Sequence, residues 1–155
     1  NSMIISHLGM GLLILGITGS SVWQEEKIKR MKINDKTEIN QYQIVFKKIY
    51  EVTGENYYAI QGEFNVYNNK KQQVTTLKPE NRLYPVTNSN TTEVAIHTNL
   101  VRDLYLVLGE GDEKNGWVVR IYYNPLVAWI WIGVLIICSG GFLSLINNVK
   151  KLNYK

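Results

Sequence analysis

The sequence is poor in cysteine and histidine, with one cysteine and two histidines among its 155 residues. A single cysteine, Cys138, excludes a disulfide bond within the chain, so cysteine usage does not indicate the redox compartment. We interpret it as a small packing residue. A P-loop, an HExxH motif and a CxxC pair are absent, and Gly109-Glu-Gly111 lacks the following helix that a dinucleotide site needs. These absences exclude the commonest catalytic signatures.

Acidic residues are missing from both ends of the chain. All 13 Asp and Glu residues lie within residues 24–124, together with 14 of the 17 Lys and Arg residues, so this central segment carries a charge of about +1. The other three basic residues, Lys150, Lys151 and Lys155, form a basic tail over residues 147–155. The basic pI therefore comes mostly from this tail, and we expect no binding to nucleic acid.

Two long apolar runs, residues 3–23 and 125–146, enclose the polar segment. About 20 apolar residues rising ~1.5 Å each span a hydrocarbon core of ~30 Å, so each run predicts a transmembrane helix. The first run lacks the basic leader and the short apolar core of a signal peptide. Because the chain begins with Asn-Ser-Met and enters the first run almost at once, we expect a C-terminal piece of a longer protein or one half of a split protein.

The central segment predicts an all-β domain, so the expected fold is two transmembrane α-helices flanking an all-β extramembrane domain. Tyr58, Ile60, Phe64 and Val66 alternate with polar residues, which is typical of a half-buried strand. Residues 24–40 predict a weak strand or a solvated stalk, and residues 68–71 a hairpin turn into a strand over 72–77. The remaining expectations are a loop over 79–85, strands over 92–96, 100–108 and 117–123, and a turn over 109–116.

His7 is the one histidine in the apolar runs. An ionisable side chain within a membrane span is costly and usually faces protein, water or a cofactor, so His7 is a candidate site residue. His7, Gly11, Ile14 and Thr18 share one helix face, and Gly11 would leave room for a flat ring. A neutral imidazole is a common ligand of haem iron. The alternatives are that His7 bonds to a neighbouring helix and that Gly11 only packs against one.

Small residues mark a second face of the first run. Gly9, Gly16 and Ser20 recur at intervals that suit close packing of helices. Aromatic residues near the inner ends of the two runs predict a belt at one membrane surface. Its members are Trp23, Tyr122, Tyr123, Trp129 and Trp131. The lysine tail favours the inner side of the membrane, which puts the β-domain outside.

The β-domain offers no recognisable catalytic set. We interpret His97 as a surface or strand histidine, and Asp103 and Glu110 as solvated carboxylates. The segment 117–123 is a candidate docking edge for a partner, with an internal strand of the sheet as the alternative.

Several segments together carry a resemblance to a known family. They are His7-Leu-Gly9, residues 77–85, 92–96, Arg102-Asp-Leu-Tyr105 with Leu108-Gly-Glu110, and the segment 117–133, WVVRIYYNPLVAWIWIG. In this order, and over nearly the whole chain, they resemble the C-terminal part of CcmF, the haem lyase subunit of the cytochrome c maturation system. The family's turn near Gly54 usually has proline where Glu55 stands, and His97 matches no family ligand.

The resemblance implies a multi-span membrane protein that acts with a CcmH-type subunit. It would take haem from a CcmE-type haem chaperone and attach the vinyl groups to a CxxCH motif of apocytochrome c. His7 matches one of two histidines that hold a haem b in the family, so the implied metal ligand is His7. With Gly11 added from its position one helical turn after His7, the expected cofactor-binding residues are His7 and Gly11. The second axial ligand would come from the rest of the CcmF-type protein, a missing chain or segment.

The resemblance also bears on activity and location. The tryptophan-rich segment and the histidines that bind the substrate haem belong to earlier parts of the family's chain, so we expect no catalytic residue here and no ligation by this piece alone. The implied location is a bacterial or mitochondrial inner membrane, in contact with lipid, with the β-domain facing the periplasm or intermembrane space. The alternative function is a non-enzymatic assembly subunit of a membrane complex without its own cofactor.

Overall fold

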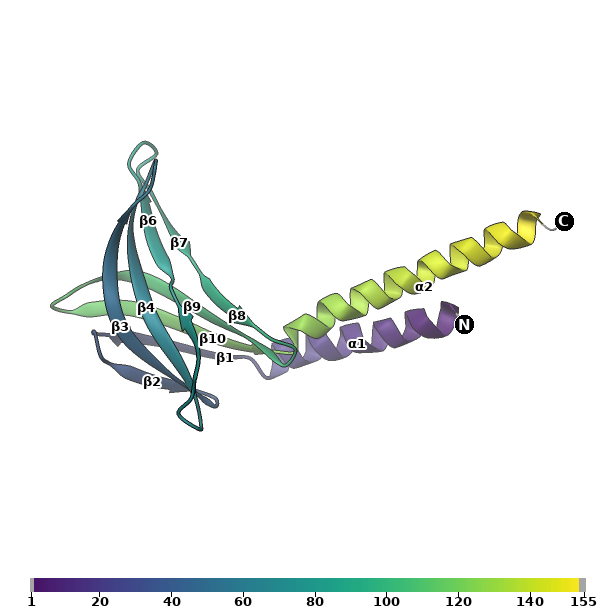
Figure 1. The fold of residues 1–155 in the computed structure, drawn as a ribbon, viewed down its shortest axis with the longest axis horizontal. Coiled ribbons are helices and arrows are strands. Elements are labelled where there is room, and N and C mark those ends of the chain that lie inside the picture. Colours follow the sequence, from purple (N-terminus) through teal and green to yellow (C-terminus); the bar gives the residue numbers. More distant parts are fainter. Residues whose placement is uncertain (1, 154–155) are drawn as a thin grey trace. The chain divides into compact units, whose positions relative to one another are not determined.

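The computed structural model describes residues 2–153 and divides into two compact units. A helical unit contains both long helices together with Thr98–Asp103, and a β-domain contains Glu25–His97 and Leu104–Tyr123. The elements of each unit are drawn in Figure 1. The expected fold class is confirmed, because two apolar helices flank an all-β domain in the sequence.

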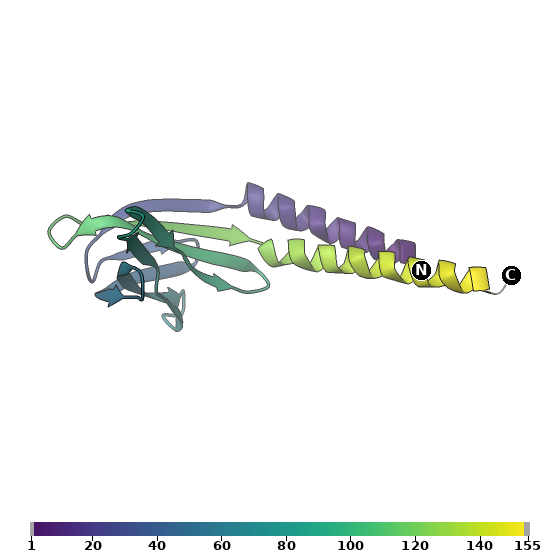
Figure 2. The same ribbon diagram turned by 90° about the horizontal axis from the view of Figure 1, so that it is seen from above.

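The helical unit is built from α1, Ser2–Val22, and α2, Val127–Asn153. Both helices are long and apolar enough to cross a membrane. Figures 1 and 2 show α1 lying beside the first part of α2, which extends beyond it. The segment predicted as a basic tail continues α2 to Asn153, while Lys155 and the side chains of Lys150 and Lys151 lie outside the described residues.

Glycines bring the two helix backbones together. A β-carbon on Gly9 would lie 2.7 Å from the backbone nitrogen of Ile137, and one on Gly16 would lie 2.7 Å from that of Ile130. Because later residues of α1 meet earlier residues of α2, the helices are antiparallel. The predicted packing face is confirmed for Gly9 and Gly16. The third small residue on this face is the buried Gly19 and not the predicted Ser20.

The β-domain contains two antiparallel sheets. One has the strand order β1-β10-β9-β8, and the other has the order β2-β3-β4-β6-β7, with β5 paired to β4. The strands are β1 Glu25–Met31, β2 Lys36–Ile39, β3 Tyr42–Thr53, β4 Tyr58–Asn68, β5 Gln73–Leu77, β6 Glu80–Tyr84, β7 Ser89–Glu93, β8 Ala95–Thr98, β9 Arg102–Asp112 and β10 Gly116–Pro125.

The core lies between the inner faces of these sheets. Phe46 of β3 and Phe64 of β4 stack with ring centroids 4.3 Å apart, and Trp117 of β10 meets Phe46 edge-on at 5.8 Å. Alternate residues of β9 and β10 complete the buried cluster, so the period of two in the sequence places every second side chain inside. The buried members on these two strands are Leu104, Leu106, Leu108, Trp117, Val119, Ile121 and Tyr123.

Several strand predictions are confirmed in this sandwich. The charged segment after the first helix is a regular strand, because β1 pairs with β10 from Glu25↔Tyr123 to Met31↔Trp117. The predicted hairpin joins β4 to β5. Its turn is closed by the side-chain oxygen of Asn68, which accepts hydrogen bonds from the backbone N–H groups of Lys70 and Gln72.

The prediction of a loop over residues 79–85 is wrong. Most of this segment forms strand β6, which pairs with β4 and with β7. Pro79 and Pro85 stand just outside the strand, so neither removes a hydrogen bond from the ladder. Instead, the Pro79 carbonyl accepts a hydrogen bond from the Gly62 N–H at 3.0 Å.

Other boundaries differ from the prediction. The strand expected over residues 92–96 is split at Val94 between β7 and β8, which belong to different sheets. The strand expected to end at residue 108 continues to Asp112, whose carboxylate accepts the Asn115 N–H at 2.6 Å and closes a shorter turn. Of the two carboxylates predicted to be solvated, Glu110 is exposed, whereas Asp103 is 5% exposed and that prediction is wrong.

The predicted aromatic belt is only partly consistent with these positions. Trp23 and Trp131 are exposed, as residues facing a membrane surface would be. Tyr123 is instead 8% exposed and lies in the core of the β-domain, with its ring 6.3 Å from that of Tyr42. The prediction that Tyr123 belongs to the belt is wrong, because strand β10 includes Tyr123 and directs its side chain into the core.

Candidate functional site

His7 lies on α1 with its side chain exposed. Its Nδ1 is 2.7 Å from the carbonyl oxygen of Met3, one helical turn earlier. A carbonyl only accepts hydrogen bonds, so this contact requires the proton on Nδ1 and leaves the lone pair on Nε2. The geometry therefore orients the imidazole and selects the tautomer in which Nε2 can bind a metal ion.

Gly11 lies one turn after His7 on the same exposed side of α1. No heavy atom lies within 4 Å of the position that a β-carbon on Gly11 would take, apart from the helix's own neighbouring backbone. Ile14 and Thr18, which continue this face, are also exposed. The helix thus has two distinct faces: Gly9 and Gly16 pack on α2, while His7 and Gly11 lie on a face that α2 does not cover.

The surface around His7 is a shallow apolar hollow. Met3, Ile4 and Leu8 line it with His7, and its volume is about 310 Å³. Within residues 2–153, no group of three or more His, Cys, Asp or Glu side chains is placed to hold a metal ion. The hollow therefore offers a metal ion one nitrogen ligand in an apolar setting, and Gly11 is not among the residues that line it.

The candidate docking edge over residues 117–123 is an internal strand. β10 lies between β1 and β9, so both of its edges are paired and the docking-edge interpretation is wrong. His97 is half-buried on β8, in agreement with its interpretation as a strand histidine.

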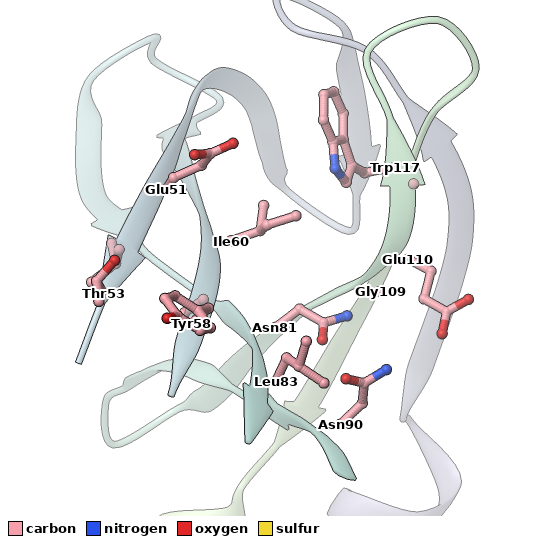
Figure 3. Close-up of a pocket in the computed structure, with 13 residues that line it drawn as sticks. Glu51, Thr53, Tyr58, Ile60, Asn81, Leu83, Asn90, Gly109, Glu110 and Trp117 are labelled. Carbon is pink, nitrogen blue, oxygen red and sulfur yellow. The ribbon is translucent and has the colours of Figure 1, made fainter. Parts of the chain in front are cut away.

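A cavity in the β-domain was not predicted from the sequence. Its volume is about 530 Å³, and it lies between the ends of β3, β4 and β6 on one side and those of β9 and β10 on the other (Figure 3). It is lined by Glu51, Val52, Thr53, Tyr58, Ala59, Ile60, Asn81, Leu83, Asn90, Gly109, Glu110, Gly111 and Trp117.

The sequence pattern indicated part of the lining of this cavity, namely the face of β4 on which Tyr58 and Ile60 lie. Tyr58 and Ile60 share a face of β4 with the buried Phe64 and Val66, yet they are 58% and 38% exposed. Periodicity predicted the face correctly. It carries no information on where along the strand the opposite sheet stops covering that face.

Comparison with known proteins agrees with this architecture. The family described as CcmF C-terminal beta-sandwich matches residues 22–125. The cytochrome c-type biogenesis protein CcmF of Escherichia coli is 39% identical over 145 residues, which are 94% of this chain and 22% of that protein. The cytochrome c-type biogenesis protein ccl1 of Rhodobacter capsulatus is 39% identical over 140 residues, 90% of this chain and 21% of that protein.

A solved structure shows the same fold. It is the cytochrome c haem lyase CcmF, matched with a TM-score of 0.66 and 19% identity over 90% of this chain and 23% of that one. The chain therefore spans between a fifth and a quarter of the length of the relatives it matches. The family match covers the β-domain, and the relatives extend the similarity across both helices. This chain belongs to the CcmF family, and it corresponds to the C-terminal part of CcmF.

Proposed function

We propose that this chain is the C-terminal portion, or a split subunit, of a cytochrome c haem lyase. In this proposal His7 supplies one axial ligand to a haem b inside the membrane, and the β-domain offers a docking surface during covalent attachment of haem to apocytochrome c. The observation that carries the proposal is the uncovered face of α1 on which His7 and Gly11 lie, in a chain of the CcmF family.

The residues of this face fit a haem. The Met3 carbonyl fixes the imidazole and leaves Nε2 for iron, as hydrogen-bonded metal-ligating histidines commonly do. Gly11 lets a macrocycle approach the backbone, and Gly9 and Gly16 hold α1 against α2 so that the ligand is presented from a supported helix. A haem b bound here would supply electrons that keep the substrate iron ferrous, as thioether formation requires.

The chain supplies one ligand and no catalytic group in this proposal. The second axial ligand comes from the rest of the CcmF-type protein, and the reaction requires a CcmH-type subunit, a CcmE-type haem chaperone and apocytochrome c. The membrane is a bacterial or mitochondrial inner membrane, and the β-domain lies on its outer side, where apocytochrome c is matured.

The test is the reduced-minus-oxidised visible spectrum of the complete protein carrying His7→Ala. We expect loss of the b-type signal, because no other histidine of this chain lies in either apolar helix. His97→Ala, which removes the other histidine of the chain, is the matched control and should leave the spectrum unchanged. If His7→Ala also left the signal unchanged, the ligand assignment would be wrong and a role as an assembly subunit without its own cofactor would be favoured.

A further inference from the structure

The cavity of the β-domain takes no part in the proposed haem site. We infer that it binds an extended peptide segment that presents an apolar side chain next to a basic residue. This inference rests on the proposed docking role of the β-domain and gives that role a location and a chemistry. Three independent features of the cavity carry it: an uncovered apolar floor, a buried indole donor and a rim of carboxylates.

The floor of the cavity is apolar and accessible. Tyr58 of β4 and Leu83 of β6 are directly paired across the two strands, and they are 58% and 40% exposed. Ile60, next on the same face of β4, is 38% exposed. Apolar residues on an inward-facing sheet surface are normally covered, and a volume of about 530 Å³ is within the range of ligand-binding pockets. The floor therefore suits one large apolar side chain.

Trp117 contributes a hydrogen-bond donor. Its side chain is only 4% exposed, and within the part of the chain that the structure describes its indole N–H has no hydrogen-bond partner. An indole nitrogen is a donor only, and buried donors are nearly always paired. Figure 3 shows Trp117 across the cavity from Tyr58 and Leu83. A backbone carbonyl of an inserted peptide, reached by a small movement of the ring, would satisfy this donor.

The rim of the cavity is acidic. Glu51 of β3 and Glu110 of β9 stand on opposite sides of the apolar residues in Figure 3. Asn81 and Asn90 add amide groups, and none of the described residues that line the cavity is Lys, Arg or His. This charge favours a basic occupant and disfavours an acidic one, because like charges across an interface are costly. An apolar side chain flanked by lysine or arginine is complementary to both the floor and the rim.

The direct test is fluorescence anisotropy with the complete protein in detergent. The probe is a short fluorescein-labelled peptide in which one phenylalanine stands between two lysines. We expect it to bind at least about tenfold more tightly than the same peptide with glutamates in place of the lysines, since complementary charge governs partner choice. A peptide with glycine in place of the phenylalanine should lose most of its binding, because the floor then has no apolar partner.

Variants assign the binding to this cavity. The double variant Glu51→Gln with Glu110→Gln should weaken binding of the lysine peptide about twofold to tenfold and reduce its dependence on salt. Glu55→Gln with Glu113→Gln removes two exposed carboxylates that do not line the cavity, and it is the matched control. Trp117→Phe keeps an aromatic ring but removes the donor, and should weaken binding about threefold to tenfold.

Filling the cavity provides a second line of evidence. Ile60→Trp should abolish binding, and Leu83→Ala, which is less demanding on folding, should weaken it. Equal binding of the lysine and glutamate peptides would overturn the inference, and so would unchanged binding to Ile60→Trp in a folded protein. These results are separable from the haem proposal, because His7→Ala should leave peptide binding intact and the cavity variants should leave the b-type spectrum intact.

Discussion

Gly9 of α1 and Gly133 of α2 are in reciprocal backbone contact. A β-carbon on Gly9 would lie 2.8 Å from the carbonyl oxygen of Gly133, and a β-carbon on Gly133 would lie 2.8 Å from the carbonyl oxygen of Gly9. Real β-carbons essentially never approach so closely. The pair therefore sets how near the two helices can lie, and the face of α1 that packs on α2 also decides which face stays uncovered for His7.

The first prediction concerns this contact. Gly9→Ala should destabilise the complete protein by about 1–3 kcal/mol, because two helix backbones would have to separate. Gly11→Ala is the matched control, since its β-carbon meets no heavy atom within 4 Å outside the helix's own nearby backbone. Thermal unfolding in detergent measures both variants, and an equal loss of stability would contradict the packing assignment.

The second prediction separates packing from cofactor binding. Gly11→Leu should reduce or abolish the b-type spectrum while leaving the unfolding temperature nearly unchanged, because the leucine would occupy the space proposed for the ring. Gly141→Leu places the same side chain in open space on α2 and should retain the spectrum. Full haem content in Gly11→Leu would mean that the macrocycle does not lie against this glycine.

The third prediction concerns the segment next to the start of α2. The indole N–H of Trp129 donates to the Leu100 carbonyl at 2.8 Å, and the Leu126 N–H donates to the Val101 carbonyl at 2.8 Å. Trp129→Phe should cost about 0.5–1.5 kcal/mol, the usual net value of one hydrogen bond, and speed amide hydrogen exchange there. Trp131→Phe, at a position that is 68% exposed, should have a smaller effect. Equal effects would argue against a structural role for this bond.

The fourth prediction is a dependence on pH in the β9–β10 turn. The backbone N–H of Asn115 donates a hydrogen bond to the Asp112 carboxylate, and this is the main reason that the pKa of that carboxyl lies below its ordinary value. The side-chain amide of Asn115 donates a second hydrogen bond, with a smaller effect in the same direction. A lowered pKa in the folded state contributes stability above the unfolded pKa of about 3.9, and this contribution is lost as pH falls through the folded pKa.

Unfolding temperatures measured from pH 6 down to about pH 3, which brackets the ordinary aspartate pKa, test this sign. Asp112→Asn should reduce the loss of stability on acidification. Glu113→Gln, which neutralises an exposed carboxylate of the same turn, should leave the pH profile close to that of the parent. A profile altered more by Glu113→Gln than by Asp112→Asn would contradict the hydrogen-bond assignment.

Much of the fold was predictable because it depends on local patterns. Alternation along β4 and the Asn68 turn predicted a hairpin, and the spacing of Gly9 and Gly16 predicted a packing face. The strand β6 was missed because prolines on both sides resemble a loop, although they fall just outside the ladder. Burial of Asp103 was also missed, since a carboxylate is ordinarily solvated and only tertiary contacts override that preference.

The sequence by itself determined the two apolar helices, the all-β segment between them and the position of His7 one turn before a glycine. These features follow from composition and from the periods of 3.6 and 2, which each segment carries alone. Only the tertiary structure decided that α2 covers the Gly9 face of α1 and leaves the His7 face open. It also decided that β10 is an internal strand, and that the opposite sheet leaves Tyr58 and Ile60 uncovered. Those outcomes depend on which segments meet across the chain, and no local pattern encodes where one surface stops covering another.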